Sequence, residues 1–366
     1  MKKLVVAIVK IAISAAILTY LFRTAWNDKS FQDLYGQSKN WTMLACAAVT
    51  TLLAVMMTFV RWHMLVRALD MDFSLKDAFR LGFLAYLFNF FSFGVVGGDV
   101  LKSVFIARQQ PDNRAGAVAS VVLDRIIGLA AMLMLGAGAF LFVNLDESSI
   151  RDSSQLETVR NACRATVILT AISLTGLTLF MIPGFLQHRF WNRLTKLPLV
   201  GGIYCRLLEA ARAYQKRRHI MLTAIGMSLG IHVLNILAFY FVAVGLPGAE
   251  PSLATHFVIV PVAMVAGAIP LPGGLGALEY ALDFLYRAVS TVAVAERQGF
   301  VVALGYRVVQ IGIAAIGLVY YISGRTEVQE LIDSANAWEE NEGESLDEEN
   351  PQDESASNMN APAMRG

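Results

Sequence analysis

Long apolar runs recur along this chain and constrain its fold more than any other feature. Six runs reach about 18 residues or more, the length a helix needs to cross a hydrocarbon layer of about 30 Å. They cover residues 4–22, 41–60, 115–143, 165–182, 220–244 and 300–322. Only 16% of the 366 residues are charged, whereas soluble domains usually carry about 25%. The sequence therefore predicts an all-α membrane protein with about six full spans.

Two further apolar stretches, 78–93 and 253–268, are interrupted by glycine and proline. The residues at the interruptions are Gly94, Gly97, Gly98, Pro270, Pro272, Gly273, Gly274 and Gly276. Backbone groups that such residues free from a helix cannot face lipid, so they line a cavity or are buried in protein. Each stretch is therefore predicted to form a broken helical hairpin, either re-entrant or fully spanning.

Basic residues predict the orientation of the chain. The segment 185–219 holds eight Lys and Arg residues against one acid, Glu209, so the positive-inside rule places it in the cytoplasm. Counting spans from this segment places both termini in the cytoplasm and lets the two hairpins enter from opposite sides. The chain is then two units of opposite orientation, each with a span, a hairpin and a second span. Inverted repeats of this kind are typical of secondary transporters.

The chain is predicted to have two parts, a membrane domain at 1–325 and a cytoplasmic tail at 326–366. From Glu327 onward there are twelve acidic residues and one basic residue, a composition typical of a disordered tail. The apolar run 4–22 lacks a small-residue cleavage motif after it and is interpreted as a retained first helix, not a signal peptide. The three cysteines indicate neither a disulfide framework nor a metal site.

Charged residues accompany both interruptions, although a charge inside a bilayer costs about 2.5–3.5 kcal/mol. The candidate binding residues are Asp99, Lys102, Asp124, Arg125, Glu279 and Arg307. Asp124 and Arg125 are adjacent in a helix and point about 100° apart, so each is expected to pair with another element. One interpretation is that ion pairs such as Asp99 with Arg125, and Glu279 with Arg307, lock the helices together.

The second interpretation is an anion-binding cavity. A helix that begins after each interruption directs its N-terminal amides at the cavity, and the guanidinium groups of Arg125 and Arg307 suit phosphate oxygens. Asp99 and Glu279 would then balance the positive charge or accept protons. Aromatic residues beside the first interruption, such as Phe88, would face lipid tails or serve as ordinary packing.

The sequence predicts no enzyme, because it contains no nucleophile elbow, phosphate-binding loop, Rossmann fingerprint or metalloprotease motif. No cofactor, metal or nucleic-acid partner is predicted. His63, His232 and His256 stand alone, at no ligand spacing, and are interpreted as packing or interfacial residues.

Several motifs occur in a fixed order along the chain. They are Phe88-Asn89, Gly94-x-x-Gly97-Gly98-Asp99-x-x-Lys102, Asp124-Arg125-Ile126-x-Gly128, Pro272-Gly273-Gly274-Leu275-Gly276-x-x-Glu279 and Tyr306-Arg307. Over about 4–325 this series resembles the transmembrane region of the lysylphosphatidylglycerol synthase family. The resemblance implies a flippase-like domain that moves lipids or lipid-linked headgroups across the cytoplasmic membrane. Gly94 stands where the family often has Pro, and Lys102 where Arg is common, which leaves the substrate open.

The full-length synthases of that family add a large soluble aminoacyl-transfer domain, for which this chain leaves no room. The leading hypothesis is therefore a lipid translocase for a phospholipid, glycolipid or polyprenyl-phosphate with an anionic headgroup. The alternative is a non-transporting membrane partner of a lipid-modifying or cell-envelope glycosyltransferase system, which would contact proteins through segment 185–219 or the acidic tail. A membrane-embedded transferase and a carrier of a soluble anion are further alternatives.

Overall fold

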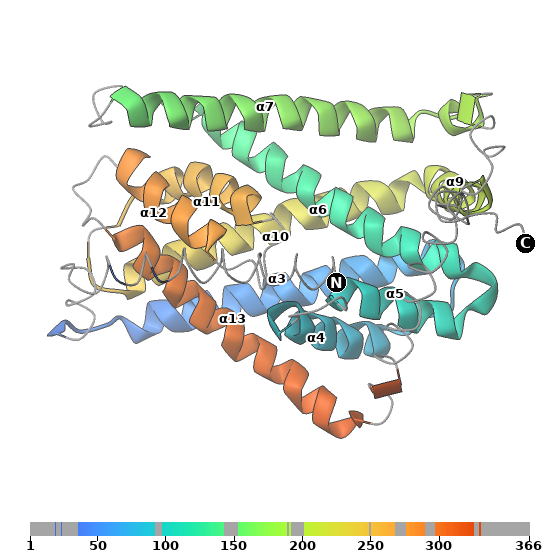
Figure 1. The fold of residues 1–366 in the computed structure, drawn as a ribbon, viewed down its shortest axis with the longest axis horizontal. Coiled ribbons are helices and arrows are strands. Elements are labelled where there is room, and N and C mark those ends of the chain that lie inside the picture. The colour runs from blue at the N-terminus through green and yellow to red at the C-terminus, as the bar shows by residue number, and fades with distance from the viewer. Residues whose placement is uncertain are drawn as a thin grey trace, which may run out of the picture.

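The computed structural model describes residues 36–91, 97–142, 153–188, 190–191, 201–248, 250–267, 276–289 and 297–325, with isolated positions at 19, 23, 329 and 330. These residues form α-helices, short 3-10 helices and connecting turns, and they contain no strand (Figure 1). The α-helices are α3 (Trp41–Arg67), α4 (Leu75–Phe91), α5 (Gly98–Gln109), α6 (Arg114–Phe142), α7 (Ser153–Met181), α9 (Gly201–Lys216), α10 (Arg218–Gly245), α11 (Leu253–Gly267), α12 (Ala277–Val289) and α13 (Gln298–Ser323). The fold is therefore all-α, as predicted.

Five of the described helices are long and apolar enough to cross a membrane: α3, α6, α7, α10 and α13. They coincide with five of the six predicted spans, and the sixth, at 4–22, lies outside the described residues. The chain is thus a multi-pass membrane protein.

Two predicted boundaries were wrong because hydropathy follows the apolar part of a helix and not its polar ends. The predicted span 41–60 continues as α3 to Arg67, so Arg61 belongs to the helix and not to a basic loop. The predicted loop 144–164 contains the start of α7 at Ser153. Gln, Glu, Arg and Ala in this first part of α7 are good helix formers, which allows the helix to extend past its apolar region.

Both predicted hairpins consist of two short helices. The helices α4, α5, α11 and α12 hold 17, 12, 15 and 13 residues. At 1.5 Å per residue each is about 18–26 Å long, less than the hydrocarbon thickness of about 30 Å. The first pair is α4 and α5, and the second pair is α11 and α12.

The two pairs enter the bundle from opposite ends. We call one end the basic end because Arg67, Arg108 and Arg217 lie there. Arg217, just before α10, contacts Ala68 at the end of α3, so the first pair starts here, and the first pair ends here at Arg108. At the other end Gln298, which begins α13, donates to the carbonyl of Pro247 at 3.0 Å. The second pair lies between these two residues in the chain, so it starts and ends at this other end.

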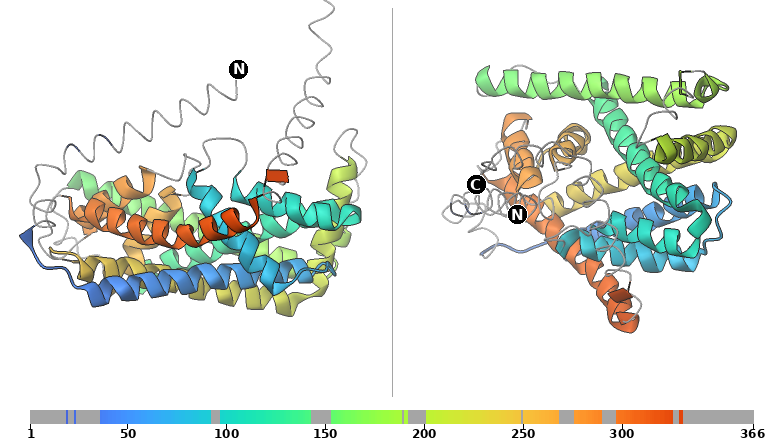
Figure 2. Two further views of the ribbon diagram at one scale, coloured as in Figure 1. Left: turned by 90° about the horizontal axis from the view of Figure 1, so that it is seen from below. Right: turned by 45° about the vertical axis from the view of Figure 1, so that its right-hand side comes forward.

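The helices α3 and α10 pack side by side more extensively than any other pair in the described structure (Figure 2). They are antiparallel, since the Asn40 amide at the start of α3 donates to the Gly245 carbonyl at the end of α10 at 3.0 Å. Around them, α4 packs on α13 and α5 on α6, whereas α11 packs on α6 and α12 on α13. Each short pair therefore contacts both α6 and α13.

The helix α7 lies along one edge of the bundle, and α13 lies at the opposite edge (Figures 1 and 2). The principal neighbour of α7 is α6, and many apolar side chains of α7 are exposed. An apolar face without protein neighbours is what a lipid-facing helix requires.

The basic segment 185–219 contains the helix α9. Its buried face carries Leu208, Ala210 and Tyr214, and the Tyr214 hydroxyl donates to the Leu65 carbonyl at 2.9 Å. Burial raises the pKa of Tyr214, so this hydroxyl stays protonated and keeps donating. The buried face and this hydrogen bond fix α9 across the basic end.

Candidate functional site

The first ion pair joins the two helices that flank the first interruption. Arg125 on α6 binds Asp99, in the first turn of α5, with two parallel hydrogen bonds: Nε to Oδ2 at 2.6 Å and an Nη atom to Oδ1 at 2.8 Å. This is the strong two-pronged geometry of guanidinium and carboxylate. The Arg125 side chain is 58% exposed and the Asp99 side chain 35%, so the pair is open on one side.

The second ion pair joins the corresponding helices of the second short pair. Arg307 on α13 donates from Nε to Glu279 Oε1 on α12 at 2.7 Å. The other oxygen of Glu279 accepts the Gly276 amide at 2.7 Å, so this carboxylate also caps the start of α12. Here the arginine is 13% exposed and the glutamate fully buried. Both predicted pairings are therefore confirmed, and they differ in accessibility.

Asp124, as expected, turns away from Arg125 and bonds to another helix. Its Oδ1 accepts from Arg61 Nε on α3 at 2.8 Å, and its backbone carbonyl accepts from the same guanidinium at 3.2 Å. Arg61 also donates to Ser228 on α10 at 2.6 Å. Both charged side chains are buried.

Arg61 is the functional candidate that sequence reasoning missed. The predicted span ends at residue 60, one position before Arg61, so the apolar pattern leaves Arg61 outside the helix. The available signal was Asp124 itself, since a buried carboxylate needs a cation from a different helix.

Lys102 lies one turn beyond Asp99 on α5, and its side chain is buried. Its ammonium group stands 4.8 Å from the centroid of the Trp62 ring, a cation–π distance. Among the described residues it forms no hydrogen bond or ion pair, and Trp62 Nε1, also buried, has no acceptor there either. Two neighbouring buried side chains thus offer donors that the described protein groups leave unused.

The charges of this region do not balance. Lys102, Arg61 and Arg125 supply three positive charges, and Asp99 and Asp124 supply two negative charges. Both carboxylates are near enough to act electrostatically on Lys102. When all five side chains are ionised, the described cluster has one more positive than negative charge, a condition suited to binding an anion.

The first interruption ends in a tight helix–helix contact. Gly98 begins α5, and a Cβ added there would overlap the backbone of Ala85 on α4. The Gly98 amide donates to the side-chain oxygen of Asn89 at 3.1 Å, so Asn89 satisfies one of the free amides at the start of α5. Gly97 has open space around it and an extended backbone with φ −72°.

At the second interruption, Gly276 has φ +94°, a conformation that glycine adopts without strain. Gly94, Pro270, Pro272, Gly273 and Gly274 lie outside the described residues. The aromatic Phe88, a candidate wall residue, packs edge-on against Tyr321 of α13 with ring centroids 6.2 Å apart.

The isolated histidines prove to be packed residues. His232 hydrogen-bonds to the Gly128 carbonyl at 2.8 Å, and His256 to the Tyr286 hydroxyl at 2.6 Å. His63 packs its ring beside Phe73. Within the described ranges no three His, Cys, Asp or Glu side chains gather in a way that could hold a metal ion.

The fold and the site define a class: multi-pass helical membrane proteins in which charged pairs lie beside short, interrupted helices. The family described as the lysylphosphatidylglycerol synthase TM region matches residues 7–317, so the chain belongs to that family. The match confirms the resemblance found in the motifs and indicates a lipid-related membrane protein. No curated protein and no solved structure matches the chain.

Proposed function

We propose that this protein is a lipid translocase that moves a phosphate-bearing headgroup between the two short-helix pairs. The observation that carries the proposal is the open ion pair of Arg125 and Asp99. Arg125 lies 11 residues into α6, about 17 Å from its start and near the middle of a 30 Å layer. An ion pair exposed at that depth is too costly to face lipid tails, which supports a polar cavity on its open side.

The arrangement of contacts supports an inverted repeat made of α3–α6 and α10–α13. Exchanging the two sets leaves the packing relations unchanged, since α4 on α13 becomes α11 on α6 and α5 on α6 becomes α12 on α13. The ion pairs exchange as well, Asp99 with Arg125 for Glu279 with Arg307.

The residues just before the two arginines follow the same exchange. Asp124 bonds to Arg61 on α3, and Tyr306 donates to Asn235 on α10 at 3.1 Å. In this proposal the short pairs are re-entrant and enter from opposite sides of the membrane, which places the two arginines at similar depths.

The two halves are equivalent in position but not in charge. The first half carries the excess positive charge and the unused donors of Lys102 and Trp62, whereas the second holds a closed, neutral pair. We assign the headgroup phosphate to the first half. Because Arg125 already uses its Nε and one Nη atom in the two-pronged contact with Asp99, a phosphate that takes the same contact displaces that carboxylate, and Asp99 is then neutralised by Lys102 or by a proton.

The experiment is a reconstituted translocation assay with fluorescent phospholipids in liposomes. Arg125→Ala and Lys102→Met are compared with Arg67→Ala, which removes an exposed pair with Asp72 and serves as the control. We expect at least a tenfold loss of rate in the first two variants, at thermal stability close to wild type, and no loss in the control. If Arg125→Ala folds and translocates lipid at the wild-type rate, the assignment of Arg125 as a phosphate ligand is wrong.

The alternative, a non-transporting partner protein, is supported by the closed pair of Glu279 and Arg307, which acts well as a structural lock. It predicts that charge reversal on the exposed bases of α9 impairs function more than the loss of Arg125. The absence of enzyme activity is part of both proposals.

A further inference from the structure

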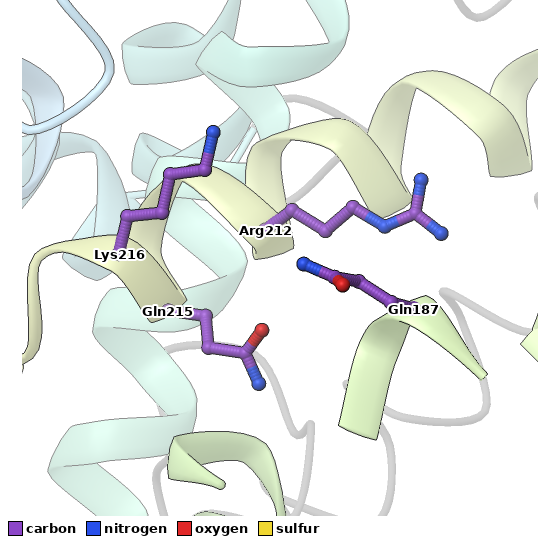
Figure 3. A pocket seen from close by; sticks show the side chains of 4 residues that line it. All are labelled: Gln187, Arg212, Gln215 and Lys216. Carbon is purple, nitrogen blue, oxygen red and sulfur yellow. The ribbon is translucent and has the colours of Figure 1, made fainter. Parts of the chain in front are cut away.

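A polar pocket of about 350 Å³ lies at the basic end, and neither ion pair is among the described residues that line it (Figure 3). Gln187 comes from the 3-10 helix η3 (Phe185–Gln187), and Arg212, Gln215 and Lys216 come from α9. The described lining residues are thus two cations and two amides, with no acid among them. Its volume falls in the range of small-molecule sites, about 300–1,000 Å³.

The pocket is held in shape by hydrogen bonds to backbone carbonyls. Arg212 donates from Nε and an Nη atom to the Leu186 carbonyl, at 3.1 and 2.8 Å. Gln215 is buried and donates to the Phe180 carbonyl at 3.0 Å and also to that of Ile182. These contacts connect α9 to the end of α7, so the pocket is a built feature of the fold.

The charge of the lining selects the ligand. Lys216 is exposed on the last turn of α9, and the guanidinium of Arg212 lies on the same helix one turn earlier. Two cations and the Gln187 amide, with no carboxylate among the described lining residues, suit a phosphate group, which accepts several hydrogen bonds at once.

The neighbouring apolar surface indicates what carries that phosphate. Exposed Ile168, Ile172 and Leu179 on α7, and Ile182 just after its end, lead to η3, where the pocket begins. A cationic pocket at the end of a lipid-facing helix matches an amphiphile with an anionic head and apolar tails.

We propose that this pocket binds the phosphate of an anionic lipid whose acyl chains lie along α7. The site is separate from the translocation route of Arg125 and Lys102. In this arrangement the bound lipid bridges α7 and α9 at the basic end.

The test is lipid binding to the full-length protein, measured by native mass spectrometry in detergent with phosphatidylglycerol or phosphatidylcholine added. Gln187→Glu places an acid in the pocket, and Lys216→Gln removes one charge. Arg206→Gln, on the exposed side of α9 outside the pocket, is the matched control. We expect phosphatidylglycerol to bind at least about tenfold more weakly to both pocket variants and normally to the control, since each pocket variant weakens a charge-assisted contact with the phosphate.

A competition arm distinguishes the lipid from a soluble phosphate. Millimolar inorganic phosphate that leaves phosphatidylglycerol bound supports the lipid, whereas full displacement assigns the pocket to a soluble phosphate compound and overturns the lipid proposal. Equal retention of phosphatidylglycerol by wild type and Gln187→Glu, with both proteins melting at the same temperature, also overturns it. Because the readout is binding, the result does not depend on whether the protein translocates lipids.

Discussion

At the scale of single residues, Arg125 is both a structural contact and the proposed phosphate ligand. Its two hydrogen bonds to Asp99 are the contacts that a phosphate would need. Replacing Arg125 with alanine removes both roles together. Exchanging Asp99 and Arg125 with each other separates the two roles.

We predict that the exchange Asp99→Arg/Arg125→Asp restores stability without restoring transport. Arg125→Asp alone places two carboxylates together and lowers the melting temperature, and the double variant re-forms an ion pair between α5 and α6. The cation then lies on α5 instead of α6, so a phosphate ligand required on α6 is still missing. Melting temperature and lipid translocation are measured on all three proteins. Full recovery of translocation in the double variant would show that the pair is only a lock.

A second residue-scale prediction concerns the buried pair of Arg61 and Asp124. Arg61→Met leaves the Asp124 carboxylate buried without its cation, a change that typically costs about 3–5 kcal/mol. Adding Asp124→Leu removes the orphaned charge and is expected to recover most of this loss. Thermal unfolding followed by tryptophan fluorescence provides the measurement, and a double variant less stable than Arg61→Met contradicts the prediction.

At the scale of elements, the start of α5 depends on close contact with α4. We predict that Gly98→Ala lowers stability by about 1–3 kcal/mol, because its methyl group overlaps the Ala85 backbone. Gly97→Ala is the matched control, since Gly97 has open space and a backbone angle that alanine adopts readily. Melting temperatures of the two variants side by side test the contact. Equal losses would mean that the interruption as a whole, not the contact at Gly98, sets the requirement for glycine.

The sequence predicted these elements unevenly, for physical reasons. Apolar length located the five described spans and both short pairs, because a helix in lipid must be apolar along its exposed surface. The pairings of Arg125 and Arg307 followed from the need of a buried charge for an opposite charge. Arg61 was missed because its burial depends on the approach of α6 and α10 to α3, which no local pattern encodes.

At the scale of the whole molecule, the inverted repeat makes a prediction about topology. In a protein with Cys46, Cys163 and Cys205 replaced by serine, single cysteines are introduced at Asp72, Gln110, Glu250 and Glu296. A membrane-impermeant thiol reagent should label the first two from one side and the last two from the other, because each short pair enters and leaves on the same side.

The labelling of a cysteine in the Lys216 position, at the basic end, identifies which side that end faces. It should match Asp72 and Gln110, since all three lie at the same end of the bundle. Labelling of Asp72 and Gln110 from opposite sides would mean that α4 and α5 together cross the membrane, and the repeat model would have to be abandoned.

Glu279 divides its two oxygens between the Arg307 guanidinium and the Gly276 amide. Glutamine in this position has only one acceptor oxygen, and its NH2 group would face either the Gly276 amide or the Arg307 guanidinium, both of which are donors. Aspartate is one carbon too short to reach both. No single replacement preserves both contacts, so an evolving chain cannot change this position by a neutral step. A substitution at Glu279 therefore disturbs the start of α12 and the ion pair with α13 at the same time.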